Sequence, residues 1–299
     1  MVNGFSLRVK RPVWNLSGSG KEMIREREIR IGNVCFNAAV SPRHGPPLVF
    51  LHGVVRRWQD WSPLLPQFTD RWRVHAVDQR GHGKTDRAMS YIVRNYVEDG
   101  IAFLRTLDEP AVMVGHSLGA LVAIGAAAIA PELVRAVVLE EPPSVVFLVN
   151  LAGSNYAIQW QAMQRLAASD RPIGDVASEL AEVRLTNGTR MGDIRDALAL
   201  RYLAGCLRHL DPAVLTPPLA GNWLEAFDLL HTASQVHVPA LLMVADTAAG
   251  GMLPKTDADA LADALPDCTR VNFPGMGHLI HGSDASRFSQ TVQTFLDTL

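Results

Sequence analysis

The sequence predicts an α/β protein with a mostly parallel central sheet flanked by helices. Three observations lead to this prediction: short apolar runs recur along the chain, helical segments separate them, and the runs are continuous rather than alternating in polarity. A strand that is apolar at every position is buried on both faces, as in a parallel sheet. Strands that alternate with helices favour the same architecture.

The expected strands each end in a loop that contains Gly or Asp. They cover residues 48–51, 74–77, 111–114, 134–139, 240–245 and 271–273. A β-hairpin over residues 26–40, turning at Gly32-Asn33, is expected to form an antiparallel edge. Helices are expected over residues 91–107, 118–130, 257–265 and 285–299. Pro131 and Pro266 would end the second and the third.

The alternation of strands and helices stops between residues 144 and 235. Amphipathic segments follow one another there without strands, over residues 155–168, 176–185 and 190–210. Right-handed crossovers bring the carboxyl ends of parallel strands to one edge of the sheet, where such proteins bind ligands. We therefore expect a helical cap (144–235) over that edge, a core formed by 26–143 and 236–299, and an N-terminal extension (1–25).

Composition narrows the classes of partner. The 299 residues are 48% hydrophobic and 19% charged, enough for a large core. A net charge of −2 offers no basic field for nucleic acid or an anionic membrane, so neither is an expected partner. The expected partner is a small-molecule substrate, and formation of a homo-oligomer is left open.

Cysteine usage and the absence of an apolar leader indicate a cytoplasmic setting. The three cysteines, Cys35, Cys206 and Cys268, are too scattered for a disulfide framework or a metal site. Residues 1–21 lack an apolar stretch of signal length, and the longest apolar run, 120–130, is much shorter than the roughly 20 residues that span a bilayer. We expect a cytoplasmic protein with no metal and no cofactor.

The pentapeptide Gly115-His116-Ser117-Leu118-Gly119 lies directly between an expected strand and an expected helix. A Gly-x-Ser-x-Gly pattern in this context forms a sharp turn that exposes the serine hydroxyl. The two glycines avoid side-chain collisions in the bend, and the positive end of the helix favours a developing oxyanion. Ser117 is therefore the predicted nucleophile, with a simple helix N-cap as the alternative.

Four motifs together resemble those of the α/β-hydrolase superfamily. They are His52-Gly53 after a strand, Asp78-Gln79-Arg80-Gly81-His82-Gly83, the pentapeptide around Ser117, and Gly275-Met276-Gly277-His278. The resemblance covers about residues 26–143 and 236–299 and leaves the cap unmatched. It implies the α/β-hydrolase fold and a serine hydrolase, and it says much less about the substrate.

The resemblance also indicates the base that would activate the serine. Family members keep the catalytic histidine in a Gly-rich loop after the last strand, where this chain has His278. His281 lies three residues further on and is the alternative on spacing alone. A serine needs such a base because its hydroxyl is a poor nucleophile at neutral pH.

Two backbone amides are expected to form the oxyanion hole. One belongs to Leu118, directly after the nucleophile, and the other to Val54, after His52-Gly53. Trp58, Trp61 and Met276 are the candidate substrate-contacting residues, with simple packing as the alternative for the two tryptophans.

The acidic member of the triad is ambiguous in this sequence. Relatives usually place it after the strand that corresponds to residues 240–245, in the pattern of a glycine, two residues and an aspartate. Here Ala245 and Ala248 occupy those two positions. Asp246 lies in the same loop, about two residues early, and is one candidate.

A second location for the acid follows the preceding strand. Certain haloalkane dehalogenases and zearalenone-type lactonases place the acid there, and Glu141 lies at a similar separation, 24 residues after Ser117. The adjacent Glu140 would point to the opposite side of the strand. Pro142 favours an extended backbone at Glu141. We prefer Glu141 as the acid and keep Asp246 and Glu140 as alternatives.

The predicted reaction is hydrolysis of a carboxylic ester through an acyl-enzyme. A serine rather than an aspartate nucleophile argues against epoxide hydrolase and dehalogenase chemistry. The alternatives are a lactonase of the zearalenone-hydrolase kind, a carbon-carbon or thioester hydrolase and, from another class, a small-molecule receptor. Apolar cap residues are candidates for the pocket lining or the cap core: Trp160, Met163, Leu203, Trp223 and Phe227.

Overall fold

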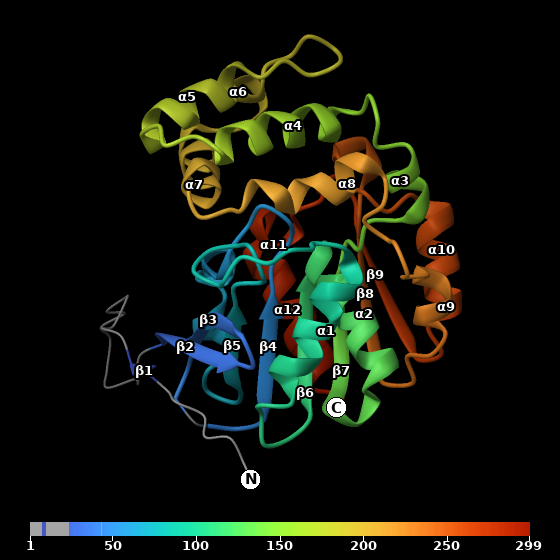
Figure 1. The fold of residues 1–299 in the computed structure, drawn as a ribbon. Coiled ribbons are helices and arrows are strands. Elements are labelled where there is room, and N and C mark those ends of the chain that lie inside the picture. Colours follow the sequence, from blue (N-terminus) through green and yellow to red (C-terminus); the bar gives the residue numbers. More distant parts are fainter. Residues whose placement is uncertain (1–7, 10–23, 43) are drawn as a thin grey trace.

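The computed structural model describes residues 8–9, 24–42 and 44–299 and contains one nine-stranded sheet (Figure 1). The strand order is β1-β2-β3-β5-β4-β6-β7-β8-β9, and pairing is parallel from β5 through β9. The predicted α/β class with a mostly parallel sheet is confirmed. These strands are β4 (Pro47–Leu51), β5 (Arg73–Val77), β6 (Ala111–His116), β7 (Val134–Glu140), β8 (Ala240–Ala245) and β9 (Cys268–Phe273).

The expected hairpin forms the antiparallel end of this sheet. Strand β2 (Arg25–Ile31) pairs with β3 (Val34–Val40), and Gly32 takes a left-handed φ of 57° in the turn. The short β1 (Arg8–Val9) pairs with β2 at the edge. The rest of the expected N-terminal extension, residues 1–7 and 10–23, lies outside the described residues.

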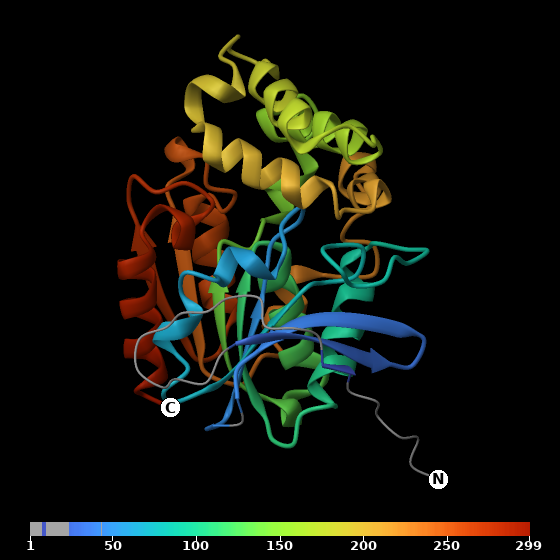
Figure 2. The ribbon, with the colours of Figure 1, turned by 90° about the vertical axis from the view of Figure 1, so that its left-hand side faces the viewer.

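Both faces of the sheet are covered by helices, as the continuous apolar strands predict (Figures 1 and 2). Met113 of β6 packs into the core on the side of α1 (Val93–Leu104) and α2 (Leu118–Ile129). Its neighbours Val112 and Val114 pack on the other side with α12 (Ala285–Leu296). Other core elements are η1 (Trp58–Trp61), η2 (Leu65–Gln67), η3 (Pro131–Leu133), η5 (Thr247–Ala249), α10 (Lys255–Ala264) and α11 (Ile280–Ser283).

The segment between β7 and β8 is helical, and most of its helices lie beyond the carboxyl ends of the parallel strands (Figures 1 and 2). We call these elements the inserted helices: α3 (Val145–Val149), α4 (Asn155–Ala167), α5 (Ile173–Glu182), α6 (Met191–Ile194), α7 (Ala197–Leu207), η4 (Pro212–Leu215), α8 (Thr216–Ala220) and α9 (Leu229–Ala233).

The amphipathic segment expected over residues 190–210 forms two helices in the structure, α6 and α7. Asp196 separates them because its backbone is extended and its carboxylate accepts a hydrogen bond from the Ala199 amide at 2.8 Å. An aspartate in this position caps a new helix rather than continuing an old one.

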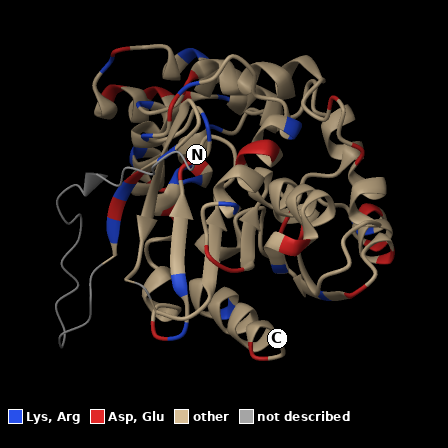
Figure 3. Cartoon of the chain, turned by 60° about the horizontal axis from the view of Figure 1, so that its bottom comes forward, with Lys and Arg blue, Asp and Glu red and all other residues tan. Residues whose placement is uncertain are grey.

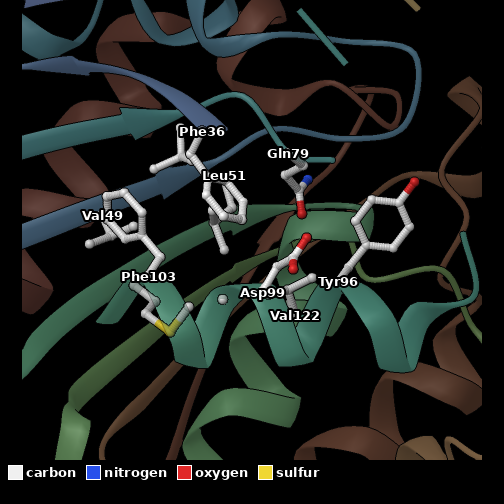
Figure 4. Close-up of a pocket in the computed structure, with 11 residues that line it drawn as sticks. Phe36, Val49, Leu51, Gln79, Tyr96, Asp99, Phe103 and Val122 are labelled. Carbon is white, nitrogen blue, oxygen red and sulfur yellow. The ribbon is translucent and has the colours of Figure 1, made fainter. Parts of the chain in front are cut away.

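A small void lies between the sheet and α1 (Figure 4). It is lined by apolar side chains such as Phe36, Leu51 and Phe103, and its volume of about 20 Å³ is close to that needed by one water molecule. The carboxylate of Asp99 at its wall is bound by Arg80 at 2.6 Å. This void is therefore a packing defect and not a substrate site.

Charged side chains of both signs are interspersed over the helices and loops seen in Figure 3. No helix within the described ranges is long and apolar enough to cross a membrane. The same residues contain no group of three or more His, Cys, Asp or Glu side chains that could hold a metal ion.

The first turn of α2 lies so close to β4 that residue 119 must be glycine. A Cβ atom at this position would lie 2.1 Å from the carbonyl oxygen of Leu51. We predict that Gly119→Ala lowers the free energy of unfolding by at least about 1–3 kcal/mol, because backbone must move. Thermal and urea unfolding would measure the change.

Gly174→Ala is the matched control for this prediction. Gly174 lies in α5, and the nearest atom to its added Cβ is the end of the Arg201 side chain at 3.7 Å. Alanine is the better helix former by about 1 kcal/mol, so this variant should be as stable as the wild type or slightly more stable. Equal unfolding curves for Gly119→Ala and the wild type would contradict the steric argument.

Candidate active site

Ser117 lies in the tight turn between β6 and α2. Its φ is 53° and its ψ is −115°, a conformation that non-glycine residues rarely adopt. The surroundings hold it there: the Ser117 amide donates to the Glu140 carbonyl at 2.9 Å, and the Ser117 carbonyl accepts from Ala120 at 2.9 Å and Leu121 at 3.2 Å. Strain of this kind persists only where neighbours fix it, which is common at functional sites.

Neighbouring glycines make this turn possible. A Cβ at Gly115 would lie 2.2 Å from the carbonyl oxygen of Gly119, and one at Gly53 would lie 2.6 Å from Nδ1 of His116. Both positions therefore tolerate no side chain.

A cavity of about 570 Å³ opens between the core and the inserted helices, a size typical of small-molecule sites. Ser117 and His278 line it from the core. Tyr156 and Trp160 of α4, and Arg195 between α6 and α7, line it from the side of the inserted helices. The structure thus brings the predicted nucleophile and the predicted base to the wall of one cavity.

Glu141 lies directly behind His278. Its Oε2 atom is 3.3 Å from Nδ1 of His278. Because a carboxylate oxygen accepts hydrogen bonds, Nδ1 is the donor and carries the hydrogen. The amide of Ala245 donates to Oε1 and the amide of Met252 donates to Oε2, both at 2.7 Å. Glu141 is completely buried, and these donors hold its carboxylate in one orientation.

The expectation of an extended backbone at Glu141 is wrong. Its φ is 52°, in the left-handed region, despite the following Pro142. Three hydrogen bonds fix this conformation. Two come from the amides that donate to the carboxylate, and in the third the Glu141 amide donates to the Met243 carbonyl at 3.0 Å.

Glu140 forms a second pair with His281. Its Oε2 is 2.6 Å from Nδ1 of His281, and its Oε1 accepts from the His281 amide at 2.8 Å. The His281 ring stacks on Trp61 with centroids 4.2 Å apart and does not line the described cavity. The two adjacent acids therefore bind different histidines, and only the partner of Glu141 reaches the cavity.

Asp246 contacts neither histidine among the described residues. Its Oδ1 accepts from the Ala248 amide at 2.9 Å and caps η5, and its Oδ2 accepts from the Gly275 amide at 3.1 Å. Asp246 ties two loops together in this arrangement.

His116 is a site residue that sequence reasoning missed. Its Nε2 is 3.0 Å from the carbonyl oxygen of His278, and because a carbonyl only accepts, Nε2 is the donor. Burial, with the charges of His278 and His281, holds the pKa of His116 well below its usual value. His116 thus anchors the backbone of His278 as a neutral ring. Its position between Gly115 and Ser117 carries no signal of this role in a single sequence.

The amides of Val54 and Leu118 find no hydrogen-bond acceptor within the described part of the chain. The next residue, Val55, has a φ of 61°, which is strained for a β-branched side chain, and its amide donates to Nε2 of His82 at 3.2 Å. His82 in turn donates from Nδ1 to the Arg80 carbonyl at 2.9 Å. Burial and nearby His52 lower the pKa of His82 to about 3, so its acceptor nitrogen stays free of a proton.

Trp58, Trp61 and Met276, the expected substrate contacts, do not line this cavity. Both tryptophans are buried in the core on the α12 side, where Nε1 of Trp58 donates to Glu26 at 2.8 Å. Met276 packs against the same core. Of the apolar candidates between β7 and β8, Trp160, Met163 and Leu203 line the cavity, and Trp223 and Phe227 do not.

The cavity also contains polar residues that sequence reasoning did not single out. Arg56 lies on the core side, Tyr156 and Gln159 lie on α4, and Arg195 lies between α6 and α7. The Tyr156 hydroxyl donates to the Gly250 carbonyl at 2.6 Å, and burial raises its pKa to about 12. Their scatter along the chain left no motif to recognise.

Comparison with known proteins identifies the family of this chain. A family model described as the alpha/beta hydrolase fold matches residues 46–285. The chain therefore belongs to the α/β-hydrolase family. The names of its relatives support hydrolase activity.

Particular relatives are also similar to this chain. A "2-(acetamidomethylene)succinate hydrolase" from Mesorhizobium japonicum is 40% identical over 283 residues, covering 91% of this chain and 95% of the relative. A "pimeloyl-[acyl-carrier protein] methyl ester esterase" from Xanthomonas axonopodis pv. citri is 26% identical, covering 85% of this chain and 96% of the relative. The crystal structure of an E-2-(acetamidomethylene)succinate hydrolase matches with a TM-score of 0.72 at 25% identity, covering 92% of this chain and 99% of that chain.

The buried Glu140–His281 pair generates a stability prediction. Replacing His281 by Phe leaves the Glu140 carboxylate buried without its side-chain partner, which typically costs about 3–5 kcal/mol. The double variant Glu140→Leu/His281→Phe should recover part of this loss because position 140 no longer carries an unpaired carboxylate. Urea unfolding of the three variants of this cycle and the wild type would measure both effects.

His278→Asn is the control, because His278 lies beside the open cavity and its removal leaves the two amide donors on Glu141. Its free energy of unfolding should change by less than in His281→Phe. If His281→Phe were as stable as the wild type, the Glu140–His281 pair would not be a stabilising element.

Proposed function

We propose that this protein is a serine hydrolase that cleaves a carboxylic ester through an acyl-enzyme, with Ser117 as nucleophile, His278 as base and Glu141 as acid. The observation that carries the proposal is the 3.3 Å contact between Glu141 and His278 at a cavity that Ser117 also lines. A histidine oriented by a buried carboxylate, in the same cavity as a strained serine, provides the groups that acyl transfer requires.

The proposed reaction begins with proton transfer. Nδ1 of His278 donates to Glu141, which leaves Nε2 as the nitrogen that accepts the Ser117 hydroxyl proton. Ser117 Oγ forms a bond to the carbonyl carbon, and the carbonyl electron pair moves to oxygen. The resulting oxyanion accepts hydrogen bonds from the amides of Val54 and Leu118.

Collapse of this intermediate breaks the ester bond. The alkoxide leaves with the proton from His278, and the acyl group stays on Ser117. His278 then takes a proton from water, which attacks the acyl carbon, and return of the proton to Ser117 releases the acid. No group other than water is consumed.

Glu141 is preferred to Asp246 because of their hydrogen-bond partners. Glu141 is held by two amides and faces His278, whereas both Asp246 oxygens accept bonds from loop amides. Glu140 faces His281, which lies away from the cavity. These contacts support the location of the acid after β7.

A second candidate reaction is hydrolysis of an amide-type acyl bond. The 40% identical relative is named for hydrolysis of 2-(acetamidomethylene)succinate, and the 26% identical relative is named for a methyl ester. The same acyl-enzyme steps serve both bonds, since only the leaving group differs. Lactone, thioester and carbon-carbon cleavage need the same apparatus and belong in the same substrate screen.

Ser117→Ala tests the nucleophile and separates an enzyme from a receptor. The wild type should turn over p-nitrophenyl acetate or butyrate repeatedly, and the variant should lose roughly a thousandfold or more of kcat. Release of p-nitrophenol measures both. Activity that persists in Ser117→Ala would exclude the proposed mechanism, and release that stops near one equivalent in the wild type would favour a receptor.

Glu141→Gln and Asp246→Asn test the acid with matched isosteric variants. Glu141→Gln cannot hold the His278 tautomer, so kcat should fall by about ten thousandfold, as for comparable triads. Asp246→Asn should keep kcat within a few fold, because Asp246 binds neither histidine and the asparagine keeps an acceptor for one of the two loop amides. Steady-state kinetics would measure both, and the reverse pattern would assign the acid to Asp246.

A further inference from the structure

Arg195 is a cation at the cavity wall without a carboxylate partner in the described chain. It follows α6 and precedes α7, and it lines the cavity from the side of the inserted helices. Its side-chain hydrogen bond goes to Oε1 of Gln159 at 3.4 Å, near the upper limit for such a bond. The adjacent Asp196 is occupied with the cap of α7 and does not compensate Arg195.

The partial burial of Arg195 means that an unpaired charge there costs free energy of desolvation. The residue is half-buried, and burial together with the positive charge of Arg56 lowers the pKa of its guanidinium below the ordinary value. Arginine nevertheless keeps its charge at any working pH. A partly desolvated charge is stabilised by a counter-charge, and the described chain supplies none within ion-pair distance.

Arg56 contributes a second guanidinium to the same cavity. Its Nε and Nη2 atoms both bind the Asp60 carboxylate at 2.6 Å, and its guanidinium lies over the Tyr202 ring, 5.1 Å from the centroid. The Asp60 side chain is buried, so this ion pair holds Arg56 in one position. Asp60 therefore balances the charge of Arg56, whereas no described carboxylate balances the charge of Arg195.

The rest of the cavity wall contains no opposing charge. Its described lining includes two arginines and neither an aspartate nor a glutamate. Glu141 lies behind His278, completely buried and held by two amides. An anionic group that enters this cavity therefore meets positive potential on the side of Arg195.

We infer that Arg195, assisted by Arg56, forms an anion subsite that binds a carboxylate of the substrate while Ser117 attacks a different acyl carbon of the same molecule. The substrate class is then a half-ester or half-amide of a small dicarboxylic acid. A guanidinium suits this role because its planar donors match the two oxygens of a carboxylate. The assignment of Ser117 as attacking group rests on the proposed function, and the ion-pairing role of Arg195 does not.

A matched pair of substrates tests the subsite. Monomethyl glutarate carries a free carboxylate, and in its neutral counterpart, the methyl ester of glutaramic acid, an amide of nearly the same shape replaces that carboxylate. The wild type should show a kcat/KM at least about tenfold higher for the anionic ester, a difference expressed mainly in KM, and added salt should reduce this preference. Methanol release would measure both substrates.

Variants at position 195 test whether the preference for the anionic ester depends on the Arg195 side chain. Arg195→Gln should bring the ratio of the two kcat/KM values close to one, and Arg195→Lys, which keeps the charge, should restore part of it. Arg201→Gln is the control, because Arg201 is an exposed arginine on α7 that does not line the cavity. It should leave both kcat/KM values unchanged. Equal loss of both substrates in Arg195→Gln would indicate a structural role and overturn the inference.

Direct binding separates the subsite from catalysis. Glutarate has the dicarboxylate chemistry but no ester, and titration calorimetry should detect its binding at millimolar concentration to the wild type and to Ser117→Ala, and not to Arg195→Gln. No binding of glutarate to the wild type would overturn the subsite whether or not esters are cleaved. Glutarate binding without Ser117-dependent turnover would leave the subsite standing and reject the proposed hydrolysis.

Discussion

Two adjacent carboxylates at the end of β7 hold the candidate site together. Glu140 and Glu141 lie on opposite sides of the chain, and each binds a different histidine of the loop and turn before α12. The Glu140 carbonyl also accepts the hydrogen bond from the Ser117 amide. The strained serine turn and the histidine loop, distant in sequence, are thereby tied to the same two residues.

A path of buried polar side chains runs from these residues to the cavity wall. From Glu140 the path passes through His281 at 2.6 Å, then Asp60, 3.9 Å from Nε2 of His281, and then Arg56. Each side chain in this path has a polar partner, which limits the cost of burying it. The same path fixes Arg56 beside the site, whereas Arg195 on the opposite wall has no such support. The contrast between the two arginines is the physical basis for assigning an anion subsite to Arg195.

Residues with a strong local signal were the easiest to predict from the sequence. The strands and core helices lie within a few residues of their predicted ranges because their apolar periodicity is local, and the sharp turn at Ser117 is predictable because it demands glycines on both sides. Side-chain direction was harder to predict. Trp58, Trp61 and Met276 lie near the predicted motifs in sequence, yet the fold turns all three into the core on the α12 side. His116 occupies a variable position of its motif and Arg195 lies in no motif, and their contacts come from segments more than 30 residues away.

The sequence by itself determined the α/β class, the strand-turn-helix around Ser117 and the two short lists of candidate acids and bases. These features depend on neighbours within a few residues, where periodicity and turn chemistry act. Only the tertiary structure decided which acid faces which histidine, because Glu141 takes a left-handed backbone that the following proline disfavours locally. The donors that stabilise that conformation, the amides of Ala245 and Met252, lie more than 100 residues further along the chain. Pairing over such distances is set by the order of strands in the sheet, which no local pattern encodes.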